Sequence, residues 1–310
     1  MLGFCLEYNI VQGDIMDNNL TLYAGIDGGG SKCSAILFNH KGEFVAQGIA
    51  GAANAARDLP LTLHSIVSSI ELALKHTQLG LESLSRIHVG AGLAGACVPN
   101  VNAKLLSWKH PFASFKVASD LTTACYGAHA GNDGALLIVG TGSSAARMQQ
   151  GQLSQFGGHG FVLGDKGSGA WFGRKAVAIT LEALDGLIGF SPLNTHIMTT
   201  LGVNSSTDLL QSMISASPSQ FAALAPGIIA LAKQGDKIAI ALIEEGVAYL
   251  DKLCRRTLQD TTLSLVLMGG LAPSLEPWLS SLVRERIVKA LAGPEWGAMQ
   301  LMQSELRLAC

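Results

Sequence analysis

Two short segments that combine glycine with hydroxyl side chains constrain this chain more than any other feature of its sequence. The first is Asp27-Gly28-Gly29-Gly30-Ser31-Lys32, after the apolar residues 22–26; the second is Gly140-Thr141-Gly142-Ser143, after residues 135–139. Glycine tolerates a positive φ and lets a backbone approach a ligand closely. Such a hairpin turns its N–H groups inward, and Ser or Thr adds hydroxyl donors. One hairpin alone would indicate only a turn, but the pair predicts two loops that grip one polyphosphate.

The residues around the two segments repeat one order. Strands are expected over 21–26, 32–38 and 43–48, and again over 135–139 and 144–149, each time as strand, glycine hairpin, strand and polar turn. This repetition predicts an internal structural duplication. Beyond residue 169 apolar residues recur at helical spacing, which predicts helices over 169–187, 207–216, 220–234, 238–258 and 295–306.

A third glycine-rich segment, residues 90–95, matches G-x-G-x-x-G after an expected strand over 86–89. A dinucleotide site of that type needs an acidic residue about twenty positions further on to bind the ribose. Nothing acidic occurs between Glu82 and Asp120. We therefore interpret the segment as a close-packed turn between a strand and a helix, not as a nicotinamide site.

The composition excludes several classes of protein. Of 310 residues 48% are hydrophobic and 14% charged, which is typical of a globular chain with a large core. The net charge of −2 argues against nucleic acid or an anionic membrane as a partner. Six scattered cysteines without a C-x-x-C pair indicate buried free thiols. Residues 1–20 are expected to form an N-terminal extension. No basic residue precedes Lys32, so no export signal is predicted and the expected location is the cytoplasm.

Three acidic residues stand beside glycines or at the ends of expected strands: Asp27, Asp120 and Asp165. Ligands of open α/β sheets bind at the carboxyl ends of strands, so these positions suit a site. The chain has neither a Walker A sequence nor a G-x-S-x-G elbow, which excludes P-loop and serine-hydrolase chemistry. Asp120 has an alternative interpretation as the N-cap of the helix that follows it.

Five motifs in order resemble the N-acetylglucosamine kinase family, which belongs to the actin-like sugar kinases alongside the BadF/BadG/BcrA/BcrD-type ATPases. They are the two hairpins, Ala118-Ser119-Asp120, Gly164-Asp165-Lys166-Gly167-Ser168 and Met268-Gly269-Gly270. The segments 110–114 and 127–129 are also similar to bacterial glucosamine kinases. The resemblance covers residues 21 to about 302.

The resemblance implies an α/β fold of two ribonuclease-H-like domains with a cleft between them. The domains would be residues 21–117 with 290–310, and residues 118–289. It also implies ATP-dependent phosphorylation of the 6-hydroxyl of N-acetylglucosamine or glucosamine, with Mg²⁺. ATP and the amino sugar would be the partners; homodimer formation is left open.

The same resemblance assigns roles to individual residues. Asp120 would be the general base, and Asp27 would act on Mg²⁺ through water. The nucleotide would contact both hairpins (Gly28, Gly29, Gly30, Ser31, Lys32, Gly140, Thr141, Gly142, Ser143) and, beneath the adenine, Gly269 and Gly270. The sugar would contact Asp120 and, in addition, Asn54, Gly157, Gly158 and Asp165.

Two departures from the family pattern bear on the sugar: His159 stands where Trp is frequent, and Lys166 where Glu or Gln is usual. The cysteine cluster of the ROK-type sugar kinases is absent, which excludes that sister group. Two other functions on this fold stay open. One is a BadF-type activator ATPase of a radical dehydratase or reductase, which would need Cys97 or Cys125; the other is a non-catalytic sugar-sensing regulator.

Overall fold

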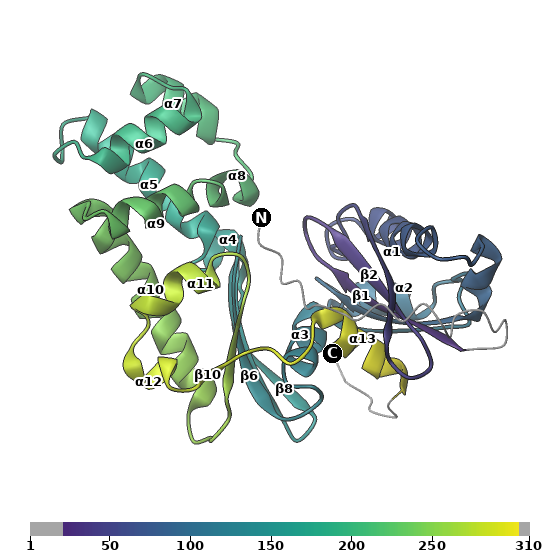
Figure 1. Ribbon diagram of the computed structural model, residues 1–310. Coiled ribbons are helices and arrows are strands. Elements are labelled where there is room, and N and C mark those ends of the chain that lie inside the picture. Colours follow the sequence, from purple (N-terminus) through teal and green to yellow (C-terminus); the bar gives the residue numbers. More distant parts are fainter. Residues whose placement is uncertain (1–20, 304–310) are drawn as a thin grey trace. The chain divides into compact units, whose positions relative to one another are not determined.

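The computed structural model describes residues 21–303, and its internal contacts divide the chain into two units, each built on one five-stranded sheet (Figure 1). The first unit runs to Gly134 and also holds Met148–Leu153 and the segment from Lys289 onward; Ala135–Arg147 and Ser154–Val288 form the second. The folding domains expected from the sequence, with boundaries at 117/118 and 289/290, stay predictions. The expected extension over residues 1–20 and the end of the last helix beyond residue 303 lie outside the described residues.

The sheet of the first unit has the strand order β3-β2-β1-β4-β5. The strands β1 to β3 form an antiparallel meander, while β4 and β5 run parallel to β1. The elements of this unit are β1 (Leu22–Gly28), β2 (Cys33–Phe38), β3 (Phe44–Ala50), α1 (Leu59–Leu74), the 3₁₀ helix η1 (Leu81–Arg86), β4 (Ile87–Leu93), α2 (Pro99–Leu106), β5 (Ser114–Ser119), α3 (Asp120–Ala128) and α13 (Pro294–Gln303).

Helices cover both faces of this sheet, and glycines set how closely they approach. On one face, a Cβ at Gly48 of β3 would collide with the backbone of α1. On the opposite face, a Cβ at Gly25 of β1 or at Gly90 of β4 would collide with backbone carbonyl oxygens of α13. The side chains of Ile36 and Met299 are buried on that second face. The helix α13 therefore rests directly on the backbone of two central strands.

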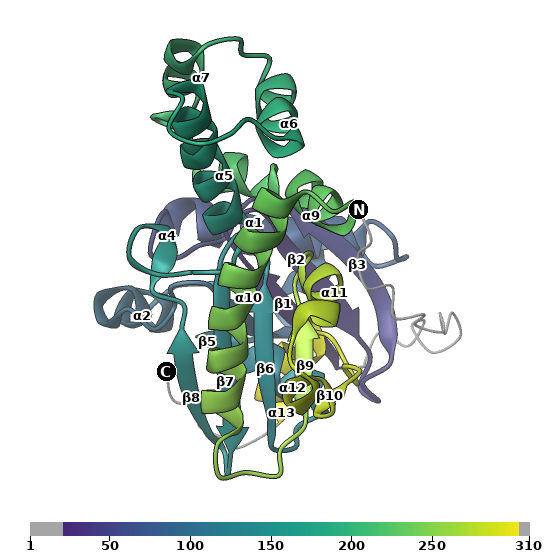
Figure 2. The ribbon, with the colours of Figure 1, turned by 90° about the vertical axis from the view of Figure 1, so that its left-hand side faces the viewer.

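The sheet of the second unit has the order β10-β9-β6-β7-β8. Figure 2 shows the long helix α10 lying across its face, where the apolar side of α10 joins the core formed by β6, β7 and α5. The elements are β6 (Gly134–Val139), β7 (Ser143–Gln149), β8 (Gln152–Gly157), α4 (Gly160–Leu163), α5 (Gly169–Leu184), α6 (Pro192–Leu201), α7 (Ser206–Met213), α8 (Pro218–Ala222), α9 (Ala225–Lys233), α10 (Lys237–Leu258), β9 (Leu265–Met268), α11 (Ala272–Leu275), the 3₁₀ helix η2 (Glu276–Trp278), α12 (Ser281–Arg284) and β10 (Ile287–Val288).

The internal duplication expected from the sequence is confirmed by the strand orders. The order 3-2-1-4-5 of the first sheet becomes 8-7-6-9-10 in the second, so each strand has a counterpart five numbers later. In both sheets the first two strands of the repeat are joined by one of the glycine-hydroxyl segments. The two segments therefore occupy equivalent positions in their own sheets.

Three expectations about local structure are wrong. The residues 90–93 belong to β4 and not to a turn. Glycine occurs there because α13 packs closely against the strand at Gly90 and α3 does so at Gly92. The helix expected over 220–234 is two helices, α8 and α9, separated by residues 223–224. Cys97, expected to be buried, is exposed, whereas Cys33, Cys125 and Cys254 are buried thiols as expected.

We predict that Gly25→Ala destabilises the protein by about 3 kcal/mol, because the new methyl group has no room against the carbonyl oxygen of Glu295 in α13. The shift of the urea unfolding midpoint measures this. Gly189→Ala is the control, since a Cβ there meets nothing within 4 Å and the change should be neutral or slightly stabilising. Equal midpoints for the two variants would contradict the packing argument.

Candidate active site

The first glycine segment is a tight hairpin between β1 and β2. The N–H of Gly29 donates to the carbonyl oxygen of Lys32 at 2.9 Å, which closes the turn. Gly30, Ser31 and Lys32 are exposed, and a Cβ at Gly30 would meet nothing within 4 Å. The hairpin therefore presents open backbone beside Asp27. Asp27 is the last residue but one of β1 and lies opposite Gly92 of β4.

The loop that carries Asn54 is tied to this hairpin through the backbone. The N–H of Ala53 donates to the carbonyl oxygen of Gly29 at 2.8 Å, and the N–H of Ala94 donates to that of Gly28 at the same distance. Asn54 itself forms a parallel bridge with Ala94. The structure thus brings the predicted sugar residue Asn54 next to the predicted phosphate hairpin, within one unit.

Asp120 is the first residue of α3 and not its cap. The N-cap is Ser119, whose Oγ accepts from the N–H of Thr122 at 3.0 Å, so the N-cap interpretation of Asp120 is wrong. The Asp120 Oδ1 atom accepts from the N–H of Leu121 at 2.9 Å. Burial raises the pKa of this carboxyl group, and the backbone hydrogen bond with Leu121 opposes that shift. A partly buried carboxylate whose basicity is increased suits proton transfer.

Asp27 and Asp120 come together on the face of the sheet that α3 and α13 cover. Gly25 and Asp27 are two positions apart in β1 and therefore point to the same face, the one on which α13 rests. On the neighbouring strand Gly92, the partner of Asp27, contacts Thr123 of α3. Because α3 begins at Asp120, both acidic residues lie at this end of the sheet.

Glu295 in the first turn of α13 is the acidic residue that the sequence analysis missed. Burial and the charges of Glu295 and Asp120 together raise the pKa of Asp27 from 3.8 to about 7, and Lys32 counteracts them only in part. In sequence Glu295 follows Pro294 and resembles an ordinary acid at a helix start. Only the contact of its backbone with Gly25 shows that this helix begins beside β1, the strand that carries Asp27.

The second glycine segment joins β6 to β7 and is held by α5. The N–H of Gly140 donates to the carbonyl oxygen of Gly142 at 2.9 Å. The first N–H groups of α5, those of Gly169 and Ala170, donate to Gly140 at 2.8 Å and to Thr141 at 3.2 Å. The start of α5 therefore fixes the hairpin from behind, while Thr141 stays exposed.

Two other predicted segments converge on this hairpin. The N–H of Gly158 donates to the carbonyl oxygen of Ser143 at 3.1 Å, and Gly157 and Gly158 both have positive φ. A Cβ at Gly142 would lie 2.8 Å from Oδ2 of Asp165, so the hairpin passes directly over that carboxyl group. The structure thus assembles Gly140–Ser143, Gly157–Gly158 and Asp165 into one cluster of the second unit.

Asp165 has a left-handed backbone, with φ of 55°. Its Oδ1 accepts from the N–H of Gly160 at 3.2 Å. Burial raises the pKa of Asp165, while the hydrogen bond from Gly160, the charge of His159 and the N–H of Ser143 oppose the shift. His159 is exposed, and Lys166 pairs with Glu245 of α10 at 2.8 Å.

Gly269 and Gly270 follow β9 beside the end of β6. A Cβ at Gly269 would collide with the backbone of Val139, and φ is 94° there, so only glycine fits. The N–H of Leu271 donates to the carbonyl oxygen of Val139 at 3.1 Å. Both glycines are exposed, and a Cβ at Gly270 would meet nothing within 4 Å. This leaves exposed backbone next to the second hairpin.

The sequence model of the BadF/BadG/BcrA/BcrD ATPase family matches residues 24–299, which include both hairpins and all three acidic positions predicted from the sequence. The chain belongs to this family. The fold class predicted from the sequence, an α/β protein with two ribonuclease-H-like sheets, is confirmed by the matching strand orders and by a similar solved structure. That structure is the "putative N-acetylglucosamine kinase" from Chromobacterium violaceum, with a TM-score of 0.86 and 29% identity over 92% of this chain and 99% of that one.

Two curated proteins of named activity are similar to this member of the family. The glucosamine kinase GspK of Vibrio cholerae is 32% identical over 280 residues, which cover 90% of this chain and 95% of the relative. The N-acetylmuramic acid/N-acetylglucosamine kinase of Clostridium acetobutylicum is 24% identical over 231 residues, 73% of this chain and 76% of the relative. The match to the ATPase family and the names of these two relatives confirm the predicted class of enzyme, a sugar kinase. Across residues 21–303 no helix is long and apolar enough to cross a membrane.

We predict that Asp27→Asn stabilises the ligand-free protein increasingly as the pH rises. The raised pKa means that the folded protein keeps a proton which the unfolded chain releases, so the free energy of unfolding falls between about pH 4 and pH 7. Asn removes this loss, and the Tm of the variant should exceed that of the wild type by about 5 °C at pH 8 and by little at pH 4. Differential scanning fluorimetry across this range checks it.

The exposed carboxylate Asp185 offers a matched control. The Tm difference for Asp185→Asn should stay constant over the same range. A pH-independent difference for Asp27→Asn would mean that the pKa of Asp27 is not raised by folding.

Proposed function

We propose that the protein transfers the γ-phosphoryl group of ATP to the 6-hydroxyl of an amino sugar, glucosamine or N-acetylglucosamine. The observation that carries the proposal is the placement of Asp120 at the start of α3, beside Asp27 and the open glycine hairpin. A phosphate grip and a partly buried carboxylate are the two parts that phosphoryl transfer to a hydroxyl requires. The names of the curated relatives support the amino sugar as acceptor.

The residues around Asp27 fit a hydrated magnesium ion. Magnesium keeps several waters and needs only one or two carboxylates besides the nucleotide phosphates. The side-chain carboxylate of Asp27 accepts no hydrogen bond from any residue in the described part of the chain, and two further acids raise its pKa. No group of three His, Cys, Asp or Glu residues among 21–303 could enclose a bare metal ion. We propose that Asp27 holds the ion through water; when bound, the ion neutralises phosphate charge.

The two hairpins would hold the phosphates through backbone N–H groups and hydroxyls. In the first, the open backbone at Gly28–Gly30, with Ser31 and Lys32, would take one part of the polyphosphate. In the second, residues 140–143 would take the other, and their backbone is fixed by α5 before any ligand arrives. Stabilising the transition state of phosphoryl transfer requires mainly that the reacting groups are positioned and that the negative charge of the phosphates is neutralised. Rigid N–H donors supply both without a reactive side chain.

Asp120 would act as general base. The proton of the sugar O6–H passes to a carboxylate oxygen of Asp120 while O6 forms its bond to the γ-phosphorus and the bond from that phosphorus to the leaving ADP oxygen breaks. Since burial raises the pKa of Asp120, its carboxylate is a stronger base than an exposed aspartate. Asn54, Asp165 and the backbone of Gly157–Gly158 would bind the remaining sugar hydroxyls and the 2-substituent, and Gly269 and Gly270 would lie under the adenine.

A panel of sugars with coupled detection of ADP tests the proposal directly. We expect Mg²⁺-dependent ADP release only with glucosamine, N-acetylglucosamine or both, and a sugar 6-phosphate by mass spectrometry. ADP release that neither amino sugar changes would refute it. Iron in the purified protein would instead favour the activator ATPase, for which the exposed Cys97 is the available thiol, since burial raises the pKa of Cys125 to about 12.

We predict that Asp120→Asn lowers kcat by on the order of 10²-fold or more, because the amide cannot accept the proton. The stability should change little, since Ser119 and not Asp120 caps α3. Steady-state kinetics and thermal unfolding separate the two effects. The matched control is Ser119→Ala, which should cost about 1 kcal/mol of stability through the lost cap. A near-normal kcat in Asp120→Asn would remove Asp120 from the reaction.

A further inference from the structure

We propose that Lys166 is a positioning residue: an ion-pair clamp from Lys166 to α10 holds Asp165 in the left-handed conformation in which it faces the second hairpin. The inference rests on the proposed function, in which Asp165 binds the sugar. It assigns a role to a residue that neither the sequence motifs nor the names of the relatives explain.

The clamp consists of two ammonium groups, one carboxylate and one indole ring. The Nζ atom of Lys166 lies 2.8 Å from Oε1 of Glu245 in α10, and the Nζ of Lys175 in α5 lies 3.9 Å from the same oxygen. Both ammonium groups lie over the ring of Trp171, at 5.4 and 5.6 Å from its centroid. The hydrogen bond with Lys166 is the main reason why the pKa of Glu245 is lowered. The Lys166 side chain is thus directed to α5 and α10.

The backbone beside Lys166 is attached to the same helices. A Cβ at Gly167 would lie 2.7 Å from the carbonyl oxygen of Gly246, the residue after Glu245. Ser168 is buried and caps α5 through Trp171. The loop is therefore held immediately after Lys166 by packing and capping, and at Lys166 by charge.

The residue before Lys166 bears the strain. Asp165 has φ of 55°, a conformation that costs energy for a residue with a side chain. Its carbonyl oxygen accepts from the N–H of Ser168 and its carboxylate from the N–H of Gly160. The carbonyl oxygen of Lys166 accepts from Oγ of Ser143 at 3.0 Å, which links the loop to the hairpin. Without the clamp the loop can relax at Asp165, and that relaxation moves its carboxylate relative to Ser143.

The energy of such a clamp is modest, because its side chains are 37% to 45% exposed. We therefore expect an effect on geometry, and not on global stability. Removing the clamp should raise KM for the amino sugar by about two- to fivefold while kcat changes less than twofold, since a misplaced Asp165 weakens ground-state and transition-state binding alike.

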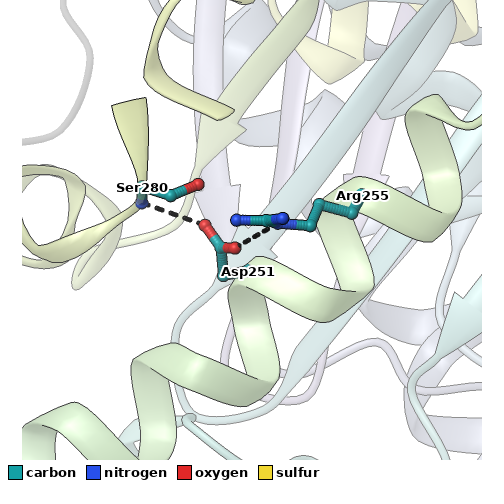
Figure 3. Close-up of polar contacts among 3 residues, drawn as sticks. All are labelled: Asp251, Arg255 and Ser280. Atoms are coloured by element: carbon teal, nitrogen blue, oxygen red, sulfur yellow. Dashed lines mark hydrogen bonds and ion pairs between the residues drawn. The ribbon is translucent and has the colours of Figure 1, made fainter. Parts of the chain in front are cut away.

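The test uses the full-length protein with the variants Lys166→Met and Glu245→Ala and their combination. Met keeps an apolar chain over Trp171, and Ala is compatible with the helix α10. The matched control is Arg255→Gln, which breaks the Arg255–Asp251 ion pair of 2.6 Å on the same helix (Figure 3), a pair that shares no residue with the clamp. We expect the same rise of KM in both single variants, little further rise in the double variant, and none in Arg255→Gln.

Hydrogen–deuterium exchange on the ligand-free protein provides a readout that does not need a sugar. The amides of Gly160, Gly164 and Ser168 are hydrogen-bonded within this loop. Peptides over residues 158–168 should exchange about fivefold faster in Lys166→Met and Glu245→Ala, and at the wild-type rate in Arg255→Gln.

The outcomes separate the clamp from the proposed function. Unchanged exchange in both clamp variants would overturn the inference whatever the enzyme phosphorylates. A raised KM in Lys166→Met with a normal KM in Glu245→Ala would also overturn it, because Lys166 would then contact the sugar itself. If no sugar is phosphorylated, the proposed function fails and the exchange experiment alone decides on the clamp.

Discussion

Close contact between the backbone of α13 and the backbone of β1 and β4 is the constraint on which the acidic cluster of the first unit depends. The contact is feasible only because Gly25 and Gly90 lack a side chain where the carbonyl groups of α13 approach. The contact places the first turn of α13, which comes late in the sequence, next to β1, the strand that carries Asp27. Three carboxylates from distant parts of the sequence therefore share one electrostatic environment. A bulkier contact would separate them and lower the pKa of Asp27.

In the second unit, different contacts hold the predicted site residues in place. There the hairpin Gly140–Ser143 is held by the first amides of α5, and the loop with Asp165 lies against α10 at Gly246. Four positions with positive φ, Gly157, Gly158, Asp165 and Gly167, lie in the segments around this hairpin. Strained backbone is retained where the surrounding structure determines it strongly, and such positions concentrate at functional sites. Glycine adopts a positive φ without strain, so the strain here is confined to Asp165, where it plays the part that carboxylate burial plays in the first unit.

The sequence could predict what depends on local pattern. Glycine next to short apolar runs indicated both hairpins, and their repetition indicated the duplication that the two strand orders confirm. Contacts between distant segments carry no such signal: Glu295 resembles a helix-start acid, and Gly90 resembles part of a turn. Ser119 and Asp120 are both good capping residues, and only the hydrogen bond to Thr122 distinguishes them. The roles of the predicted site residues stay predictions, because position alone does not establish chemistry.

The burial of Asp27 carries a consequence for how such a site works. A carboxyl group with a pKa of about 7 is only partly ionised in the neutral, ligand-free protein. A nearby cation favours the ionised form, so its binding would release a proton and remove the repulsion from Glu295 and Asp120. The free energy stored in holding these acids together thus becomes part of the affinity for a positively charged group. Under the proposed function, an acidic cluster that is costly to the empty protein would for this reason favour a metal ion that arrives with a nucleotide.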